Sequence, residues 1–348
     1  MIVAREGRWK NRLLAAASVL ATLVVLEAGV RVANREALFA ADNYLVRERD
    51  LSTSAYPSEY HELLGWAPRP NFDSNRNKWG TRVTIDGRGL RVNGNPAPPA
   101  GAPLILCVGD SFTFGDEASN SETWPAALER LTGARVENGG VFGYGFDQTV
   151  LRAELLAPEL DPDILVLSVV TSDIPRCELS MRMGVSKPYF AVMDGGLELR
   201  NTPPPKPDTE LDPLRRALGY SRLAHWILSK LAPGWWLSGC WSEERAHERG
   251  EDVACLLCDR VARLASPHTR CVIFLQYWGD TLERPASFDR LIACAQARSI
   301  QVVDLMPELQ AAHQEDPARF EALFDGHMTA RGNEFAAQVL AQGLGLAP

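Results

Sequence analysis

The sequence lacks an excess of basic residues, and it contains no long charge run, internal repeat or low-complexity tract. Lys and Arg together number 36 against 44 Asp and Glu, which gives a net charge of −8. Proteins that bind nucleic acid neutralise phosphates with a basic surface, so this balance argues against a nucleic-acid partner. The 348 residues are 46% hydrophobic, which is enough to bury a full α/β core and to carry appended segments.

A clear cleavage site for a signal peptide is also missing. A basic flank over residues 1–12 precedes an uncharged apolar stretch that begins at residue 13 and ends before Glu27. No clear small-x-small pattern follows, so we expect an uncleaved transmembrane anchor over residues 13–32, with a cleaved signal peptide as the alternative. Glu27 and Arg31 are four residues apart and can pair near the membrane interface. The basic flank predicts a single-pass inner-membrane protein, with the domain that follows the anchor on the periplasmic side.

The cysteines are few and odd in number, so at least one of the seven thiols is free. Three of them fall in apolar segments and are expected to be buried thiols, namely Cys107, Cys271 and Cys294. Cys255 and Cys258 share a predicted helix over residues 251–265. Because no strand and turn precede them, as a redox motif needs, we expect two packed thiols. Cys177 and Cys240 flank a variable segment, and a disulfide between them would suit a location outside the cytoplasm.

Short apolar runs alternate with helical patterns from residue 103 to residue 348. The predicted strands span residues 104–108, 135–138, 164–170, 271–276 and 301–304. The predicted helices include residues 122–131 and 148–156, and a last helix follows Thr329, which is its expected N-cap. This alternation indicates an α/β fold with a doubly wound parallel sheet of about five strands.

Two segments interrupt or precede this alternation. Residues 42–102 form a lead-in, in which residues 64–68 and 83–91 predict a small hairpin. Between about residues 177 and 250 the pattern fails, and we expect an insertion that covers the carboxyl edge of the sheet, where open α/β sheets bind ligands. Its tryptophans, which include Trp235, Trp236 and Trp241, either pack the insertion onto the core or line a sugar or acyl site.

The tripeptide Gly109-Asp110-Ser111 directly follows the apolar run over residues 104–108. Open α/β sheets bind ligands at the carboxyl ends of their strands, so Ser111 is expected at that edge. A serine hydroxyl becomes a useful nucleophile when a histidine takes its proton and a carboxylate orients the histidine. His327 and Asp325, near the far end of the chain, can supply both groups. The alternative interpretation is an ordinary turn and helix N-cap, which also favour Asp and Ser after Gly.

These motifs resemble the sequence blocks of the SGNH, or GDSL, hydrolase family, and in particular its membrane-anchored bacterial branch. The first block matches residues 109–115, and the second matches residues 138–145. The resemblance implies a flavodoxin-like sheet, Ser111 as the nucleophile, and the backbone N–H groups of Ser111 and Gly143 as donors to the oxyanion. Glycine suits position 143 because a backbone that approaches a substrate closely has no room for a Cβ atom.

The other two blocks depart from the family pattern. The third normally ends in Asn-Asp, and here Ser172 stands in the place of the asparagine that donates to the oxyanion. A hydroxyl is shorter than an amide, and losing one such donor commonly costs on the order of 10²–10³ in turnover. The last block is Asp-x-x-His in many members, whereas Asp325 lies two residues before His327. This shorter spacing also occurs in the membrane-associated branch that handles acetylated polysaccharides.

Tyr277 and Trp278 follow the fourth predicted strand at the same edge, so we predict that they line the substrate site. Together the residues predict a serine esterase that acts on an acylated envelope carbohydrate or a small ester, without a metal or cofactor. An O-acyltransferase supplied by a membrane acyl-donor partner is one alternative, because a sugar hydroxyl can replace water. A catalytically weak carbohydrate-binding relative is a second alternative. A flavodoxin-like mononucleotide binder is a third, but it would have no use for the pair Asp325 and His327.

Overall fold

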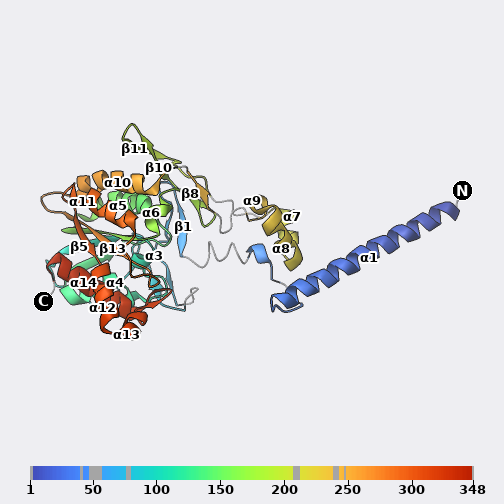
Figure 1. Ribbon diagram of the computed structural model, residues 1–348, viewed down its shortest axis with the longest axis horizontal. Coiled ribbons are helices and arrows are strands. Elements are labelled where there is room, and N and C mark those ends of the chain that lie inside the picture. Colours follow the sequence, from blue (N-terminus) through green and yellow to red (C-terminus); the bar gives the residue numbers. More distant parts are fainter. Residues whose placement is uncertain are drawn as a thin grey trace. The chain divides into compact units, whose positions relative to one another are not determined.

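The structure is a computed structural model that describes residues 3–39, 42–46, 57–75, 80–206, 212–237, 243–246 and 248–346. The chain divides into two compact units. Unit 1 comprises residues 1–54 and 208–242, and unit 2 comprises residues 55–207 and 243–348. Figure 1 labels the helices and strands of both units.

Five parallel strands form the central sheet of unit 2, in the order β14-β13-β7-β5-β6. They are β5 (Leu104–Val108), β6 (Arg135–Asn138), β7 (Ile164–Val170), β13 (Arg270–Gln276) and β14 (Gln301–Asp304). The chain runs outward from β5 to β6 and then returns past β5 to β7, which is the flavodoxin-like strand order. Every residue of β5 and β7 is buried, as expected for parallel strands that are covered on both faces. The predicted fold class is confirmed.

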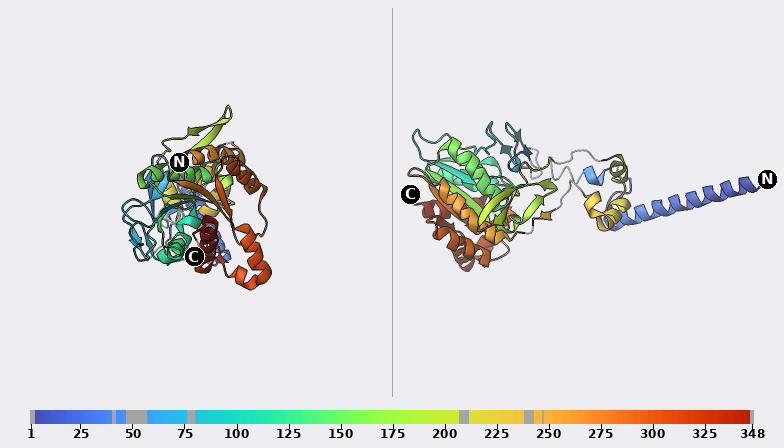
Figure 2. Two further views of the ribbon diagram at one scale, coloured as in Figure 1. Left: turned by 90° about the vertical axis from the view of Figure 1, so that its left-hand side faces the viewer. Right: turned by 90° about the horizontal axis from the view of Figure 1, so that it is seen from above.

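Helices cover both faces of this sheet, as Figures 1 and 2 show. On one face α4 (Trp124–Thr132) packs against α14 (Ala330–Leu344). On the other face lie α5 (Phe146–Leu160), α10 (Gly250–Leu264) and α11 (Ala286–Gln296). The remaining helical segments of unit 2 are short: α3 (Ser111–Phe114), η1 (Asn120–Glu122), α6 (Asp173–Arg176), α12 (Met306–Glu315) and α13 (Pro317–Glu321). The α14 helix begins as predicted, since the Thr329 hydroxyl accepts a hydrogen bond from the Gly332 N–H.

Short antiparallel pairings surround the sheet in the described part of unit 2. They are β1 (Ser58–His61) with β2 (Gly65–Pro68), β3 (Asp73–Ser74) with β4 (Val83–Thr84), and β15 (Phe324–Asp325) with β16 (His327–Met328). Within the predicted insertion they are β8 (Leu179–Arg182) with β9 (Val185–Ser186) and β12 (Glu244–Arg245), and β10 (Tyr189–Met193) with β11 (Gly196–Arg200). The lead-in therefore holds two separate strand pairs, because residues 65–68 pair with β1 and residues 83–84 pair with β3.

The helices of unit 1 include α1 (Val3–Ala33), α7 (Pro213–Leu218), α8 (Arg222–Leu231) and α9 (Pro233–Trp236), and residues 44–46 are also helical. Residues Trp9–Ala33 are long and apolar enough to cross a membrane, although a signal sequence would pass the same test. The middle of the predicted insertion thus belongs to the unit that contains α1. Trp236 is fully buried there against Leu45, so it is a packing residue of unit 1. Trp241 lies outside the described residues.

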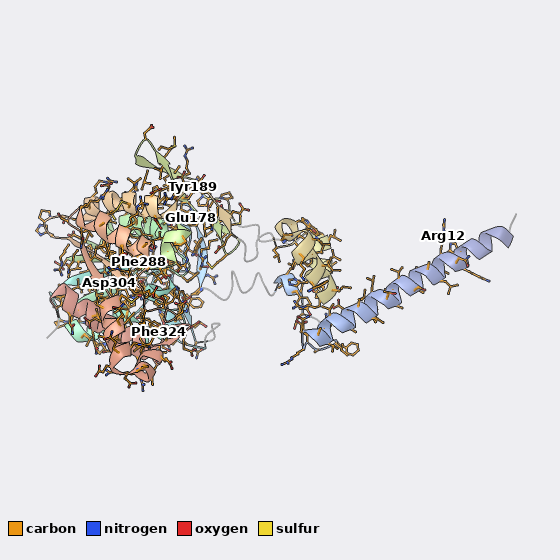
Figure 3. The ribbon with its side chains drawn as sticks, viewed as in Figure 1. Arg12, Glu178, Tyr189, Phe288, Asp304 and Phe324 are labelled. Atoms are coloured by element: carbon orange, nitrogen blue, oxygen red, sulfur yellow. A yellow bond between two sulfur atoms is a disulfide. The ribbon has the colours of Figure 1, made fainter. Side chains whose placement is uncertain are left out.

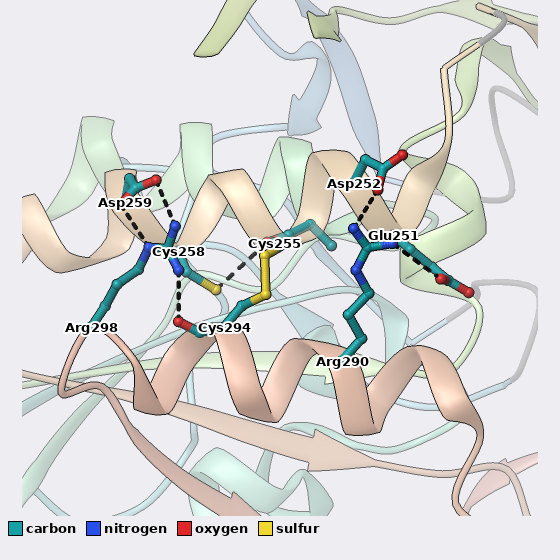
Figure 4. Close-up of a disulfide and its surroundings, with 9 residues drawn as sticks. Glu251, Asp252, Cys255, Cys258, Asp259, Arg290, Cys294 and Arg298 are labelled. Carbon is teal, nitrogen blue, oxygen red and sulfur yellow. Dashed lines mark hydrogen bonds and ion pairs between the residues drawn. A yellow bond between two sulfur atoms is a disulfide. The ribbon is translucent and has the colours of Figure 1, made fainter. Parts of the chain in front are cut away.

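A disulfide joins Cys255 on α10 to Cys294 on α11, with their Cα atoms 5.3 Å apart (Figure 4). This corrects the prediction that both residues are thiols. The two helices lie side by side on one face of the sheet, and pairs of charged residues flank the disulfide. Arg298 contacts Asp259 at 2.6 Å on one side, and Arg290 contacts Asp252 on the other. Sequence spacing carries no information on which helix faces meet.

The other cysteine predictions have mixed outcomes. Cys107, Cys258 and Cys271 are buried free thiols, as expected. Cys177 is also a buried free thiol, and its predicted partner, Cys240, lies outside the described residues.

Removing the disulfide with Cys255→Ser and Cys294→Ser together should lower the free energy of unfolding by about 4 kcal/mol. The bond closes a loop across a sequence separation of 39, and loops of that length lose about this much unfolded-state entropy when they are cross-linked. Urea denaturation under non-reducing conditions measures the effect. Wild-type protein treated with a reductant is the control and should match the double variant. Equal stability of oxidised wild type and double variant would contradict the expectation.

Candidate active site

Ser111 is the first residue of α3, immediately beyond the carboxyl end of β5. Asp110 is the N-cap of this helix, and its carboxylate accepts a hydrogen bond from the Phe112 N–H at 2.9 Å. The preceding turn requires Gly109, because a Cβ atom there would lie 2.2 Å from Thr113 Oγ1. The sharp turn therefore presents the Ser111 hydroxyl at the strand order reversal between β5 and β7, where ligands bind in this fold.

His327 contacts Ser111 from the opposite end of the sequence. Its Nε2 atom lies 2.9 Å from Ser111 Oγ, although 216 positions separate the two residues. The β15-β16 hairpin delivers the imidazole, and Gly326 at its turn has φ of +74°, a conformation that favours glycine. The predicted pairing of these two side chains is thus present in the geometry. An Nε2 atom in this place can accept the hydroxyl proton of Ser111.

The carboxylate that lies beside His327 belongs to Glu117. Its Oε1 atom is 3.5 Å from His327 Nδ1, and its Oε2 atom accepts a 3.4 Å hydrogen bond from the His327 backbone N–H. Asp325 has an exposed side chain and makes no hydrogen bond or ion pair within the described part of the chain. Sequence analysis missed Glu117 because no motif marks it. The one unusual property is its backbone, which has φ of +69° in a residue other than glycine.

The other predicted oxyanion donors lie on the loops that follow the two neighbours of β5. Gly143 follows β6, and its φ of +74° again favours glycine. A Cβ atom there would lie 2.6 Å from Met183 Cε, so a side chain at this position would displace the end of the Met183 side chain. Ser172 follows β7, and its buried Oγ atom has no hydrogen-bond partner in the described structure. An unpaired buried hydroxyl can donate to a substrate oxygen.

One arginine joins the three loops that carry Ser111, Gly143 and Ser172. Arg176 Nη1 lies 2.9 Å from Asp110 Oδ2, 2.7 Å from Asp173 Oδ1 and 2.9 Å from the Tyr144 carbonyl oxygen. Each of these three partners is the sequence neighbour of one candidate site residue. The cluster is buried, and burial together with the negative charge of Asp110 raises the pKa of Asp173 well above its usual range. Arg176 is therefore a positioning residue for the site.

Replacing Arg176 by lysine should lower kcat for a small ester by about 100-fold with little change in KM, because one ammonium cannot hold all three loops. Steady-state kinetics measures the split, and thermal unfolding shows whether the variant is folded. The matched control is Arg245→Lys, since Arg245 is exposed and pairs only with Glu178 among the described residues. An unchanged kcat in folded Arg176→Lys would refute the positioning role.

Arg182 is a second residue that sequence analysis missed. It lies on β8 in the predicted insertion, and its Nε atom is 3.6 Å from the place where a Cβ atom of Gly143 would be. That Nε atom is buried without a hydrogen-bond partner in the described structure, while Nη1 pairs with Glu243. Burial, aided by the charge of Arg176, lowers the pKa of Arg182 to about 10. The insertion therefore adds a cation beside the loop of Gly143.

The two predicted substrate-lining residues differ in their placement. Tyr277 is fully buried, and its hydroxyl donates a 2.7 Å hydrogen bond to Asp304, so it packs in the core of unit 2. Its position one residue beyond β13 turns its side chain inward against Phe288. Trp278 packs instead beside the candidate site. Its ring centroid lies 5.1 Å from that of His327 and 4.7 Å from that of Phe112.

Solved structures of G-D-S-L proteins are similar to this chain. One is a lipolytic family member from Veillonella parvula, with 17% identity over 69% of this chain and 97% of that one, at a TM-score of 0.40. The lipase/acylhydrolase from Enterococcus faecalis has 14% identity over 70% and 95%, at 0.39. An acetyl xylan esterase has 11% identity over 69% and 99%, at 0.41. No protein-family model and no curated protein sequence matches the chain.

Proposed function

We propose that the protein is a serine esterase in which Ser111 is the nucleophile and His327 is the general base. The single observation that carries this proposal is the 2.9 Å contact between Ser111 Oγ and His327 Nε2 at the carboxyl edge of the sheet. A neutral imidazole at hydrogen-bond distance is the arrangement that activates a serine hydroxyl. A structural N-cap serine would need no histidine beside its hydroxyl.

The reaction proceeds in two halves at this site. Ser111 Oγ attacks the ester carbonyl carbon while its proton passes to His327 Nε2, and the carbonyl oxygen becomes an oxyanion. The backbone N–H groups of Ser111 and Gly143, with the hydroxyl of Ser172, donate to that oxyanion. The C–O bond to the alcohol then breaks, and His327 returns the proton to the leaving oxygen. Water repeats the sequence on the acyl-enzyme and releases a carboxylic acid.

Glu117 is the carboxylate that the geometry favours for orienting His327, in preference to Asp325. A carboxylate near Nδ1 keeps the proton on that nitrogen, so that Nε2 is free to accept the proton from Ser111. Glu117 Oε1 is close enough for an ion pair once His327 is protonated in the transition state. The alternative is that Asp325 orients His327, and substitutions of Glu117 and Asp325 distinguish the two assignments.

The substrate that we propose is an O-acyl group on an envelope carbohydrate or related polymer. The proposal follows from the resemblance of the sequence blocks to the membrane-associated branch, and from the location that α1 predicts.

The Cys255–Cys294 disulfide supports an extracytoplasmic location, since disulfides persist in oxidising compartments. With the basic flank in the cytoplasm, the catalytic unit faces the periplasm. A reporter fused after Pro348 should then be active only if it functions outside the cytoplasm.

Purified full-length protein tests this proposal with a small acetyl ester and an acetylated polysaccharide as substrates. We expect release of acetate from both, measured in the presence and absence of a free sugar acceptor. Acyl transfer to the sugar in place of acetate release would replace hydrolysis by transfer at the same site. Neither release nor transfer, from protein that is folded and membrane-inserted, would overturn the enzymatic proposal.

Ser172→Ala should lower kcat on the small ester by about 10-fold or more, with KM nearly unchanged, if the hydroxyl donates to the oxyanion. The companion variant Ser172→Asn restores the residue that the family pattern has at this position. Steady-state kinetics on both variants is the measurement. If neither changes kcat, only backbone N–H groups stabilise the oxyanion.

A further inference from the structure

Glu27, near the C-terminal end of α1, connects this helix to the start of α8 within unit 1. Glu27 Oε2 accepts hydrogen bonds from Ser221 Oγ and the Leu223 N–H, each at 2.8 Å, and Oε1 accepts one from the Arg222 N–H at 2.8 Å. These N–H groups belong to the first turn of α8, which has no intrahelical acceptors for them. A carboxylate at this end of a helix is also favoured by the helix dipole.

Arg31 completes this junction. Its Nε atom contacts Glu27 Oε1 at 2.6 Å, which confirms the pairing predicted from their spacing. Its Nη2 atom donates to the Tyr220 carbonyl oxygen at 3.0 Å, and its guanidinium lies over the Tyr44 ring. Arg31 is almost fully buried by these contacts. A leader that is cleaved and discarded has no use for side chains fitted to a segment almost 200 residues away.

Helices α8 and α9, and the residues just before α8 and just beyond α1, expose large apolar side chains. Trp226 and Leu231 on α8 are 48% and 79% exposed, Trp235 on α9 is 42% exposed, and Tyr220 before α8 is 53% exposed. Phe39, just beyond α1, is 96% exposed. We refer to the four aromatic residues among them, Phe39, Tyr220, Trp226 and Trp235, as the aromatic collar. Soluble domains rarely leave so many large apolar groups in water on so small a unit.

The charge of the same segment has the opposite sign to that of the whole protein. Residues 212–237 contain four basic side chains and one acidic side chain, a net charge of +3, while the full chain has −8. Lys230 on α8 holds its ammonium 4.3 Å from the Trp226 ring centroid. Tryptophan with a neighbouring cation is typical of the headgroup level of a membrane, which carries negative charge where anionic lipids are present.

The uncharged run within α1 is shorter than the hydrocarbon core of a bilayer, so charged residues of the helix lie close to the membrane edge. The 14 residues from Leu13 to Leu26 span about 21 Å at 1.5 Å per residue, against a hydrocarbon core of about 30 Å. The junction at Glu27 therefore falls at the edge of the hydrocarbon core. A hollow of about 690 Å³ lies beside it, lined by Leu23, Ala28, Leu218 and Ile227 among others. This hollow is apolar and open, as a place filled by lipid chains would be.

We propose that α7, α8 and α9 form an interfacial module that lies in the headgroup region of an anionic bilayer and holds α1 as a permanent anchor. The aromatic collar enters the interface, and the exposed basic side chains of Arg216 and Lys230 face the lipid phosphates. Arg215 is buried, with a hydrogen bond to the Trp236 carbonyl oxygen, and Arg222 pairs with Glu36. The charges of Glu27 and Arg31 offset each other, and the N–H groups at the start of α8 bind the Glu27 carboxylate. These contacts offset the free-energy cost of placing two charged side chains at the membrane edge. The proposal rests on the proposed membrane anchor and not on the ester chemistry.

Bromolipid quenching on the full-length protein tests the module. The protein is reconstituted into phosphatidylcholine vesicles containing phosphatidylglycerol, with and without brominated acyl chains. The emission of Trp226 is the difference between the spectra of the wild type and Trp226→Phe, and brominated lipid should quench this difference. The emission of Trp235, obtained in the same way with Trp235→Phe, should also be quenched. The matched control is Trp278→Phe in unit 2, whose lost emission should not be quenched. If brominated lipid does not quench the emission of Trp226, the proposal is overturned.

Hydrogen exchange of residues 222–231 provides a second measurement that does not depend on the tryptophan variants. Their amides should exchange at least 10-fold more slowly in phosphatidylglycerol vesicles than in neutral detergent, and Glu27→Ala should abolish that protection. Equal exchange in both environments would contradict the module. Purified protein that begins after residue 30 would overturn the anchor and the module together. The Ser111→Ala variant should give the wild-type result in every arm, so failure of the ester proposal remains separate.

Discussion

Replacing Ser111 by alanine is expected to abolish ester turnover, with a loss of about 10⁴-fold or more in kcat. The hydroxyl oxygen is the atom that forms the bond to the acyl carbon, and it lies 2.9 Å from the His327 Nε2 atom that takes its proton. Steady-state kinetics measures the loss. Thermal unfolding should be nearly unchanged, because the removed hydroxyl makes only a 3.3 Å contact with Asp110 besides the one with His327. Ser121→Ala, at an exposed serine of unit 2, is a control that should retain full activity.

His327→Ala should cost nearly as much as Ser111→Ala, and the double variant should be scarcely worse than either single one. Residues that act as a unit in one proton transfer give strongly non-additive losses. Additive losses from the two substitutions would show that they do not share a mechanism, whatever their distance in the structure.

Glu117→Gln is expected to lower kcat by about 100-fold, and Asp325→Asn is expected to change it by less than about 3-fold. The amide of glutamine keeps the size of the side chain but removes the charge that stabilises protonated His327 at 3.5 Å. Asp325 is exposed, and in the described structure its carboxylate makes no ion pair with the imidazole, which pairs with Glu117. The two variants are matched, because each replaces a carboxylate by its amide within the same part of unit 2. Kinetics on a neutral ester near pH 7 measures both.

The reverse pattern would restore the role that the sequence blocks imply for Asp325. A large loss with Asp325→Asn and none with Glu117→Gln would mean that the hairpin of Gly326 adopts another arrangement during catalysis. Equal and small losses would mean that His327 is oriented by its packing against Phe112 and Trp278.

The central sheet is predictable from the sequence because its strands are buried on both faces. A strand such as β7 is then apolar at every position but one, Ser168, and a run like residues 164–170 is recognisable without its neighbours. The same reasoning locates Ser111, because the residue after a buried parallel strand lies at the ligand-binding edge. His327 is predictable only through its motif, since nothing local indicates that it meets Ser111.

The sequence does not predict which distant segments of the chain contact each other. Glu117 is a polar loop residue with no pattern around it, and only the packing of the β15-β16 hairpin brings it to His327. The partner of Cys255 depends on which faces of α10 and α11 meet. The interruption over residues 177–250 is visible in the sequence, but its division between the two units is not. Tyr277 misleads because alternate residues beyond a strand point to opposite sides, and this one points into the core.

Labelling with a fluorophosphonate probe tests the central claim most directly, because the probe reacts only with a serine whose proton is removed by a neighbouring base. The full-length protein is incubated with the probe, digested, and analysed by mass spectrometry, alongside His327→Ala and a heat-denatured sample. We expect one modified residue, Ser111, in the native protein and a loss of labelling in both comparison samples. Absence of label on Ser111 in folded protein, or equal labelling of His327→Ala, would contradict the assignment of Ser111 and His327 as a catalytic pair.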